Sequence, residues 1–198
     1  MALKRSLLVP LLVFLVAALT LLATLLMILP GPQQGASKVP IGGPFRLTSH
    51  EGKVFTEEDL KGKPFAVFFG FTHCPEVCPT TLYDLTQDLQ TLGSDADKLR
   101  VAFITVDPAQ DTPELLKTYL GSFDPRIVGL TGTEEQIAEV AKAYKIYYRK
   151  VPTDSGYTMD HSATIFLMDS KGEFYGTSNF QESQDVRRSK LKQLIKNG

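Results

Sequence analysis

The apolar positions of this chain follow two different patterns. From Leu7 to Leu29 they form an almost unbroken run, whereas from about Ile41 onward they recur with the spacing of strands and helices. As a helix the run would be roughly 35 Å long, which is enough to cross a bilayer. Lys4 and Arg5 precede it and no basic cluster follows closely, so we expect an uncleaved anchor whose N-terminus stays in the cytoplasm. A cleaved signal peptide is the alternative, although the run is longer than such peptides usually carry.

A short polar segment separates this run from the rest of the chain. Residues 31–40 are rich in Pro, Gly and polar side chains, a composition typical of a tether without a fold of its own. The remaining residues suffice for one domain with a single core. In a bacterium this organisation predicts a single-pass protein of the inner membrane with its globular domain in the periplasm. The expected divisions are an anchor at 1–30, a linker at 31–40 and an exported domain at 41–198.

Within the domain, strand-like and helix-like segments alternate. Short apolar runs predict strands, and apolar residues three or four positions apart predict amphipathic helices. The expected strands are 45–49 and 53–56 as a hairpin, then 65–71, 100–106, 127–130, 145–151, 163–168 and 173–175. Helices are expected before Gly93, from Pro113, after a capping box at Thr133 and Gln136, and from near Ser183. This alternation predicts an α/β layered fold with a central sheet.

The composition narrows the possible chemistry. The formal net charge is −1 and the basic residues are dispersed, which argues against a nucleic-acid-binding surface. The chain has only three histidines and two cysteines, so few side chains are available for metal binding or nucleophilic chemistry.

The two cysteines, Cys74 and Cys78, stand directly after the strand expected at 65–71. At such a junction between a strand and a helix, backbone N–H groups and the helix dipole lower thiol pKa values, so we expect thiolates at neutral pH. The pair can close a disulfide or hold a soft metal. A purely structural disulfide is disfavoured because it would close a very short loop.

His161 is the histidine that best completes a metal site with these cysteines. Two thiolates and one imidazole suit Cu(I), and the imidazole also permits Cu(II). Zinc is the competitor, but a structural zinc site normally has four protein ligands. Asp160 is expected to supply an oxygen or to orient a neighbour, and Asp107 and water are the other sources of an oxygen ligand for Cu(II). We expect the His73 side chain to point away from the metal site and His50 to be solvated.

Around the two cysteines the sequence is Phe71-Thr72-His73-Cys74-Pro75-Glu76-Val77-Cys78-Pro79-Thr80-Thr81-Leu82. This run resembles the signature of the Sco/SenC family. Three further segments agree with the family, namely Gly42-Gly43-Pro44-Phe45, Asp107-Pro108-Ala109-Gln110-Asp111-Thr112-Pro113 and Asp160-His161-Ser162. The resemblance extends from about Ile41 to the C-terminal helix. Gln110 stands where the family usually has Arg, which leaves Asp107 and Asp111 without one charge partner.

The resemblance implies a membrane-anchored, thioredoxin-like copper protein with an inserted hairpin that assists cytochrome c oxidase assembly. It implies that Cys74, Cys78 and His161 bind copper and that the partner is the dinuclear copper site of oxidase subunit II. Other periplasmic copper chaperones or thiol reductants are further expected partners. The alternative is a thiol–disulfide oxidoreductase that uses Cys74 and Cys78 as a redox-active pair, and a peroxidase is a weaker third reading. We favour a copper chaperone because thiol exchange does not require His161.

Overall fold

The computed structural model describes residues 5–28, 40–154 and 156–198. It divides into two compact units: α1 (Arg5–Ile28) belongs to the first, and the second is the globular unit Pro40–Gly198. Residues 7–28 of the expected span Leu7–Leu29 lie in α1, whereas residues 1–4 and 29–39 of the expected anchor and linker lie outside the described residues. Among the residues described, no helix is both long and apolar enough to cross a membrane. The expected divisions of the chain therefore stay predictions.

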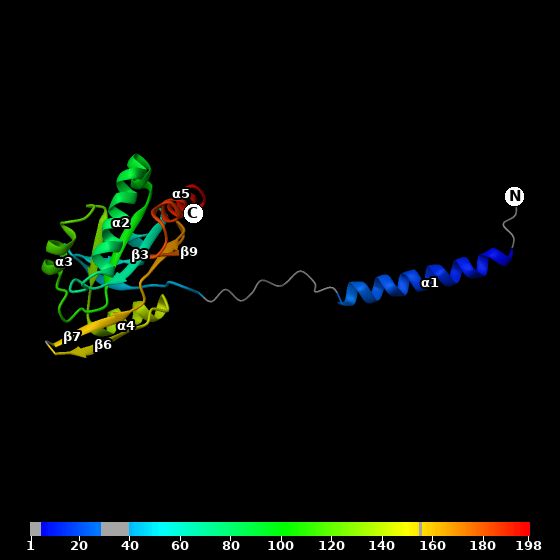
Figure 1. Cartoon of the computed structure of the whole chain (residues 1–198), viewed down its shortest axis with the longest axis horizontal. Helices are drawn as coiled ribbons and strands as arrows, with labels where there is room; N and C mark the ends of the chain where they lie inside the picture. The colour runs from blue at the N-terminus through cyan, green and yellow to red at the C-terminus, as the bar shows by residue number, and fades with distance from the viewer. Residues whose placement is uncertain (1–4, 29–39, 155) are drawn as a thin grey trace. The chain divides into compact units, whose positions relative to one another are not determined.

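The globular unit is built around a mixed sheet that includes β3 and β9 (Figure 1). This sheet has seven strands in the order β2-β1-β5-β4-β3-β8-β9. The three central strands β5, β4 and β3 run parallel, and every other pair of neighbours is antiparallel. This confirms the expected α/β fold with a central sheet. The strands of this sheet are β1 (Arg46–Ser49), β2 (Val54–Thr56), β3 (Phe65–Gly70), β4 (Arg100–Thr105), β5 (Ile127–Thr131), β8 (Thr164–Met168) and β9 (Phe174–Asn179).

The globular unit contains the four expected helices, and each matches the one boundary that the sequence analysis gave for it. They are α2 (Val77–Leu92), α3 (Pro113–Leu120), α4 (Glu134–Ala143) and α5 (Gln184–Asn197), and two 3-10 turns cover Glu57–Asp59 and Gly93–Lys98. The capping box is confirmed, since the Thr133 side chain accepts from the Gln136 N–H and the Gln136 side chain accepts from the Thr133 N–H. Gly93 follows the last residue of α2, as expected of a residue that tolerates a positive φ.

The central strand β3 explains why the cysteines have a rigid support. All six residues of β3 are buried, and because side chains alternate along a strand, both faces of the sheet are covered there. The parallel pairing of β3 with β4 ends at Gly70 and Thr105. The loops that follow these two strands therefore leave the sheet from the same edge, and they are the segments 71–76 and 106–112.

One element was missed by the sequence analysis. The strands β6 (Tyr148–Thr153) and β7 (Gly156–His161) form a second, two-stranded sheet. This sheet lies beside α4 (Figure 1). The sequence analysis predicted one extended segment at 145–151 and no strand between it and the strand expected at 163–168. The segment begins later because Lys145 adopts a left-handed conformation with φ of 59°, which turns the chain at the end of α4. The predicted strand 173–175 is also too short, since β9 continues to Asn179.

Candidate metal centre

The three predicted ligands Cys74, Cys78 and His161 converge, with one ligand atom of each within 4.8 Å of the others. They come from different places in the chain. Cys74 lies in the loop after β3, Cys78 in the first turn of α2, and His161 at the end of β7. The site therefore brings together the edge of the main sheet and the separate β6–β7 hairpin.

Cys74 is the reactive sulfur of the pair. It is partly exposed, no disulfide joins it to Cys78, and the Cys78 N–H donates to its sulfur at 3.4 Å. A hydrogen bond from the Cys78 side chain lowers the pKa of Cys74 to about 4; burial opposes this shift, and His161 and backbone N–H groups of the helix start add to it. Cys74 is thus a thiolate at neutral pH, as the sequence predicts.

The expectation that both cysteines are thiolates at neutral pH is wrong for Cys78. It is fully buried, and its pKa is raised because ionisation would break its hydrogen bond to the Cys74 sulfur and leave a charge in an apolar setting. A metal that binds both sulfurs must therefore displace the Cys78 proton. The sequence analysis erred here because it considered the helix dipole, which acts on both residues, and had no measure of burial.

Gly70 makes room for the buried sulfur, and the sequence analysis did not identify it. A Cβ atom at this position would lie 2.7 Å from the Cys78 Sγ and 2.6 Å from the Phe103 ring, closer than such atoms approach. The available signal was a glycine in an otherwise bulky strand, immediately before the cysteine motif. Any larger residue would push Cys78 away from its place beneath the strand.

His161 presents one ring nitrogen to the cysteines and fixes the other. Its Nε2 lies 3.6 Å from the Cys78 Sγ, and its Nδ1 lies 3.1 Å from the carbonyl oxygen of Ser162. Because a carbonyl only accepts, the Nδ1 carries a proton, so the Nε2 is the atom that would bind a metal through its lone pair. The ring also packs edge-on against Phe71, with centroids 5.7 Å apart.

The other candidate residues lie outside this cluster. Asp160 is exposed and pairs with Arg149 across the hairpin at 3.4 Å, so it neither faces the sulfurs nor orients His161. His73 is exposed beside Thr72, as expected. His50 is not simply solvated, which corrects the prediction. Its Nδ1 accepts the Gly129 N–H at 2.9 Å and so helps to join the end of β1 to β5.

Two buried carboxylates of the β4–α3 loop hold the surroundings of the site. Asp111 accepts from the Thr72 N–H and hydroxyl and from the Thr105 hydroxyl, so it fixes the start of the cysteine loop. Burial raises the pKa of Asp111, and these hydrogen bonds oppose that shift. Asp107 accepts from the Gln110 amide at 2.9 Å. The glutamine therefore supplies a neutral donor to Asp107, while the threonines serve Asp111, and neither carboxylate lacks partners.

Comparison with known proteins agrees with this geometry. The sequence model of the family described as SCO1/SenC matches residues 33–196. The mitochondrial protein SCO2 of Saccharomyces cerevisiae is 44% identical over 156 residues, which cover 76% of this chain and 52% of the yeast protein. The chain thus spans about half the length of that relative.

Solved structures show the same fold. ScoI of Bradyrhizobium japonicum, determined with copper bound, is 49% identical with a TM-score of 0.73 and covers 78% of this chain and 99% of that one. BsSco, described as a member of the Sco family of cytochrome c oxidase assembly proteins with a disulfide switch, is 26% identical with a TM-score of 0.64, over 84% and 100% of the two chains. The thioredoxin-like architecture expected from the resemblance is therefore confirmed, and the chain belongs to the SCO1/SenC family.

Proposed function

We propose that this protein binds copper through Cys74, Cys78 and His161 and delivers it to the dinuclear copper site of cytochrome c oxidase subunit II. The observation that carries the proposal is the convergence of two sulfurs and one imidazole nitrogen within 4.8 Å. The copper-bound ScoI structure and the role of the Sco family in oxidase assembly support it.

The donor set suits a cargo metal that has to leave again. Two sulfurs and one imidazole favour Cu(I), and three ligands leave a coordination position open to a partner's thiolate. Cys74 and His161 are partly exposed, so an incoming ligand can replace them first, whereas Cys78 is buried. Cu(II) would also require an oxygen ligand, and water is the natural source because Asp107 and Asp160 are engaged elsewhere.

A second candidate function is thiol–disulfide exchange, and the ionisation of the pair favours it. The Cys74 thiolate would attack a partner's disulfide and form a mixed disulfide while the partner's other sulfur leaves as a thiolate. Cys78 would then lose its proton and displace the partner's sulfur from Cys74. The products are an oxidised Cys74–Cys78 pair and a reduced partner, so this reaction would prepare a partner's cysteines for metal.

Substitution of His161 distinguishes the two functions. In the reduced protein, His161→Ala is expected to weaken copper binding by at least about 100-fold, since even groups that only orient a ligand are worth about 10–100-fold. The His73→Ala variant is the matched control, because this exposed histidine lies next to Cys74 but outside the cluster. Both variants are expected to keep a reversible Cys74–Cys78 disulfide. Metal analysis and a copper-competition titration measure the first effect, and redox titration measures the second.

Oxidase assembly in cells then decides between delivery and reduction. Delivery predicts that cells with His161→Ala fail to assemble the oxidase and recover in excess copper. Normal assembly in this variant, with failure only when a cysteine is changed, would instead establish thiol exchange as the main function.

We further propose that the N-terminal run anchors the domain on the periplasmic face of a bacterial inner membrane. The apolar run and the preceding Lys4 and Arg5 support this, and the apolar side chains of α1 between Leu11 and Leu22 are exposed in the structure. Burial of these side chains in lipid would remove them from water.

A reporter fused to the C-terminus tests this topology. Alkaline phosphatase is expected to be active there, because it requires export, and a reporter that works only in the cytoplasm is expected to be silent. The opposite pattern would refute the orientation, and a mature chain that begins after the apolar run would refute the anchor.

A further inference from the structure

The β6–β7 hairpin, which carries His161, has little support from the main sheet. Its strands pair with each other and form a sheet of their own. An isolated two-stranded hairpin is at best marginally stable in water. The position of His161 relative to the cysteines must therefore depend on how side chains of the hairpin contact the rest of the domain.

Three side chains of β7 share the face that meets the domain. Tyr157, Met159 and His161 alternate along the strand, and Met159 is buried while the other two are partly buried. Asp160, between them, is exposed and belongs to the opposite face. Tyr157 thus lies about 13 Å along the strand from His161, toward the tip of the hairpin.

Tyr157 makes the strongest polar contact between the hairpin and the domain. Its hydroxyl donates to Asp107 Oδ1 at 3.0 Å. Asp107 is almost fully buried, its other oxygen accepts from Gln110, and its N–H donates to the Thr105 hydroxyl. A hydrogen bond to such a fixed carboxylate is stronger than one between neutral groups.

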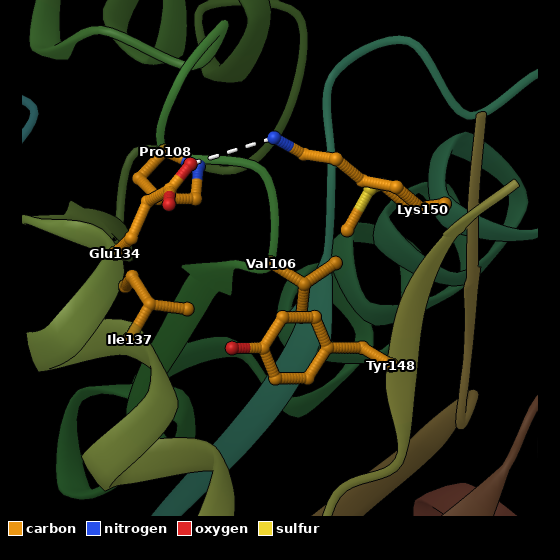
Figure 2. Close-up of a pocket in the computed structure, with 7 residues that line it drawn as sticks. Val106, Pro108, Glu134, Ile137, Tyr148 and Lys150 are labelled. Atoms are coloured by element: carbon orange, nitrogen blue, oxygen red, sulfur yellow. Dashed lines mark hydrogen bonds and ion pairs between the residues drawn. The ribbon is translucent and has the colours of Figure 1, made fainter. Parts of the chain in front are cut away.

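Met159 belongs to the hydrophobic core and Tyr148 and Tyr157 pack against it, but the packing of the hairpin leaves a gap. A cavity of about 230 Å³ lies between the hairpin, the β4–α3 loop and α4, lined by residues that include Val106, Ile137 and Tyr148 (Figure 2). Lys150 of the hairpin forms an ion pair with Glu134 of α4 at 3.4 Å. Both side chains are substantially exposed, so this ion pair contributes little to holding the hairpin in place. Lys150 also lies 5.0 Å from the centre of the Tyr157 ring.

The same loop holds both parts of the site. Asp107 receives the hairpin through Tyr157, and Asp111 receives the cysteine loop through Thr72. Thr105 connects the two acids, because its hydroxyl donates to Asp111 and accepts from the Asp107 N–H. The distance between the imidazole and the sulfurs is therefore set by contacts with one short segment.

We propose that Tyr157 is a positioning residue for His161. Its hydrogen bond to Asp107 holds the β6–β7 hairpin against the β4–α3 loop and so keeps the imidazole beside the cysteines. The consequence for copper rests on the proposed function, whereas the consequence for the hairpin does not.

The test is Tyr157→Phe in the full chain, which removes the hydroxyl and keeps the ring that packs beneath Lys150. Amide hydrogen exchange of residues 148–161 in the reduced, metal-free protein is expected to accelerate about tenfold, and copper affinity to fall by about tenfold. Tyr147→Phe is the matched control, since it removes the hydroxyl of an exposed tyrosine that directly precedes the hairpin. It is expected to change neither quantity.

A double variant shows whether the effect on copper passes through His161. In a His161→Ala background, Tyr157→Phe is expected to cause no further loss of affinity. An equal loss in both backgrounds, or unchanged hydrogen exchange in the hairpin, would overturn the proposal. Faster exchange without a loss of copper affinity would also overturn it and leave the copper site intact. If the His161→Ala variant itself kept full copper affinity, the proposed ligand set would be wrong, and so would the positioning role of Tyr157.

Discussion

Cys74 is expected to react with an alkylating reagent at a nearly constant rate between about pH 6 and pH 8, because its thiolate already predominates there. The cause is the hydrogen bond that the Cys78 side chain donates to it, which lowers the pKa of Cys74 to about 4. An ordinary cysteine reacts about tenfold faster for each pH unit in this range, since its thiolate is still a minor species. Mass spectrometry of the modified cysteine at each pH measures the rate.

Cys78→Ala is the informative variant for this prediction. It removes the donor, so the pKa of Cys74 is expected to rise toward its ordinary value and its reaction to become dependent on pH in the same range. His73→Ala is the control, because that exposed ring takes no part in the cluster. A wild-type rate that still climbs steeply above pH 7 would show that Cys74 is an ordinary thiol.

The lowered pKa of Cys74 also makes the stability of the folded domain depend on pH in a definite direction. Between about pH 4 and the ordinary thiol pKa of 9.0, the unfolded chain binds the Cys74 proton and the folded chain does not. This residue therefore stabilises the folded state increasingly as pH rises through that window, and its contribution is lost as pH falls to 4. Cys78 acts in the opposite sense above pH 9.0, because its raised pKa keeps its proton in the folded state.

The main sheet could be predicted because its elements depend on local pattern. The buried run of β3 and the capping box before α4 are determined by neighbours in sequence, and both are present. The convergence of Cys74, Cys78 and His161 could be predicted because few residues in the chain can bind a soft metal. These predictions needed no knowledge of how distant segments meet.

What the sequence did not reveal depends on distant contacts. The strand β7 has a polar and mixed composition and, among the residues that the structure describes, pairs only with β6, so no periodic apolar pattern marks it. The difference between the two cysteines arises because Cys78 is buried next to Gly70, which only the packing of α2 on the sheet produces. The hydrogen bond from Tyr157 to Asp107 joins residues fifty positions apart.

A buried ion pair between α2 and α5 also escaped the sequence analysis. Arg187 donates to Asp88 at 2.6 Å, and both side chains are almost completely buried. Arg188 approaches the other oxygen of Asp88 at 3.3 Å, and Arg187 approaches Asp84 at the same distance. Arg187, one of the basic residues of α5, is the largest fully buried side chain that the structure describes.

Asp88→Ala is expected to destabilise the domain by about 3–5 kcal/mol, because it leaves the buried Arg187 guanidinium without its main partner. Denaturant unfolding followed by circular dichroism measures the change. Replacing both partners, as in Asp88→Leu with Arg187→Met, is expected to recover most of the loss, since a buried pair and an apolar pair of similar volume are often equivalent. Lys98→Ala, which removes an exposed ion pair with Asp95, is the control and is expected to leave the midpoint unchanged. An Asp88→Ala variant as stable as this control would show that Arg187 reaches water when its partner is removed, and that α5 is not held on α2 by this pair.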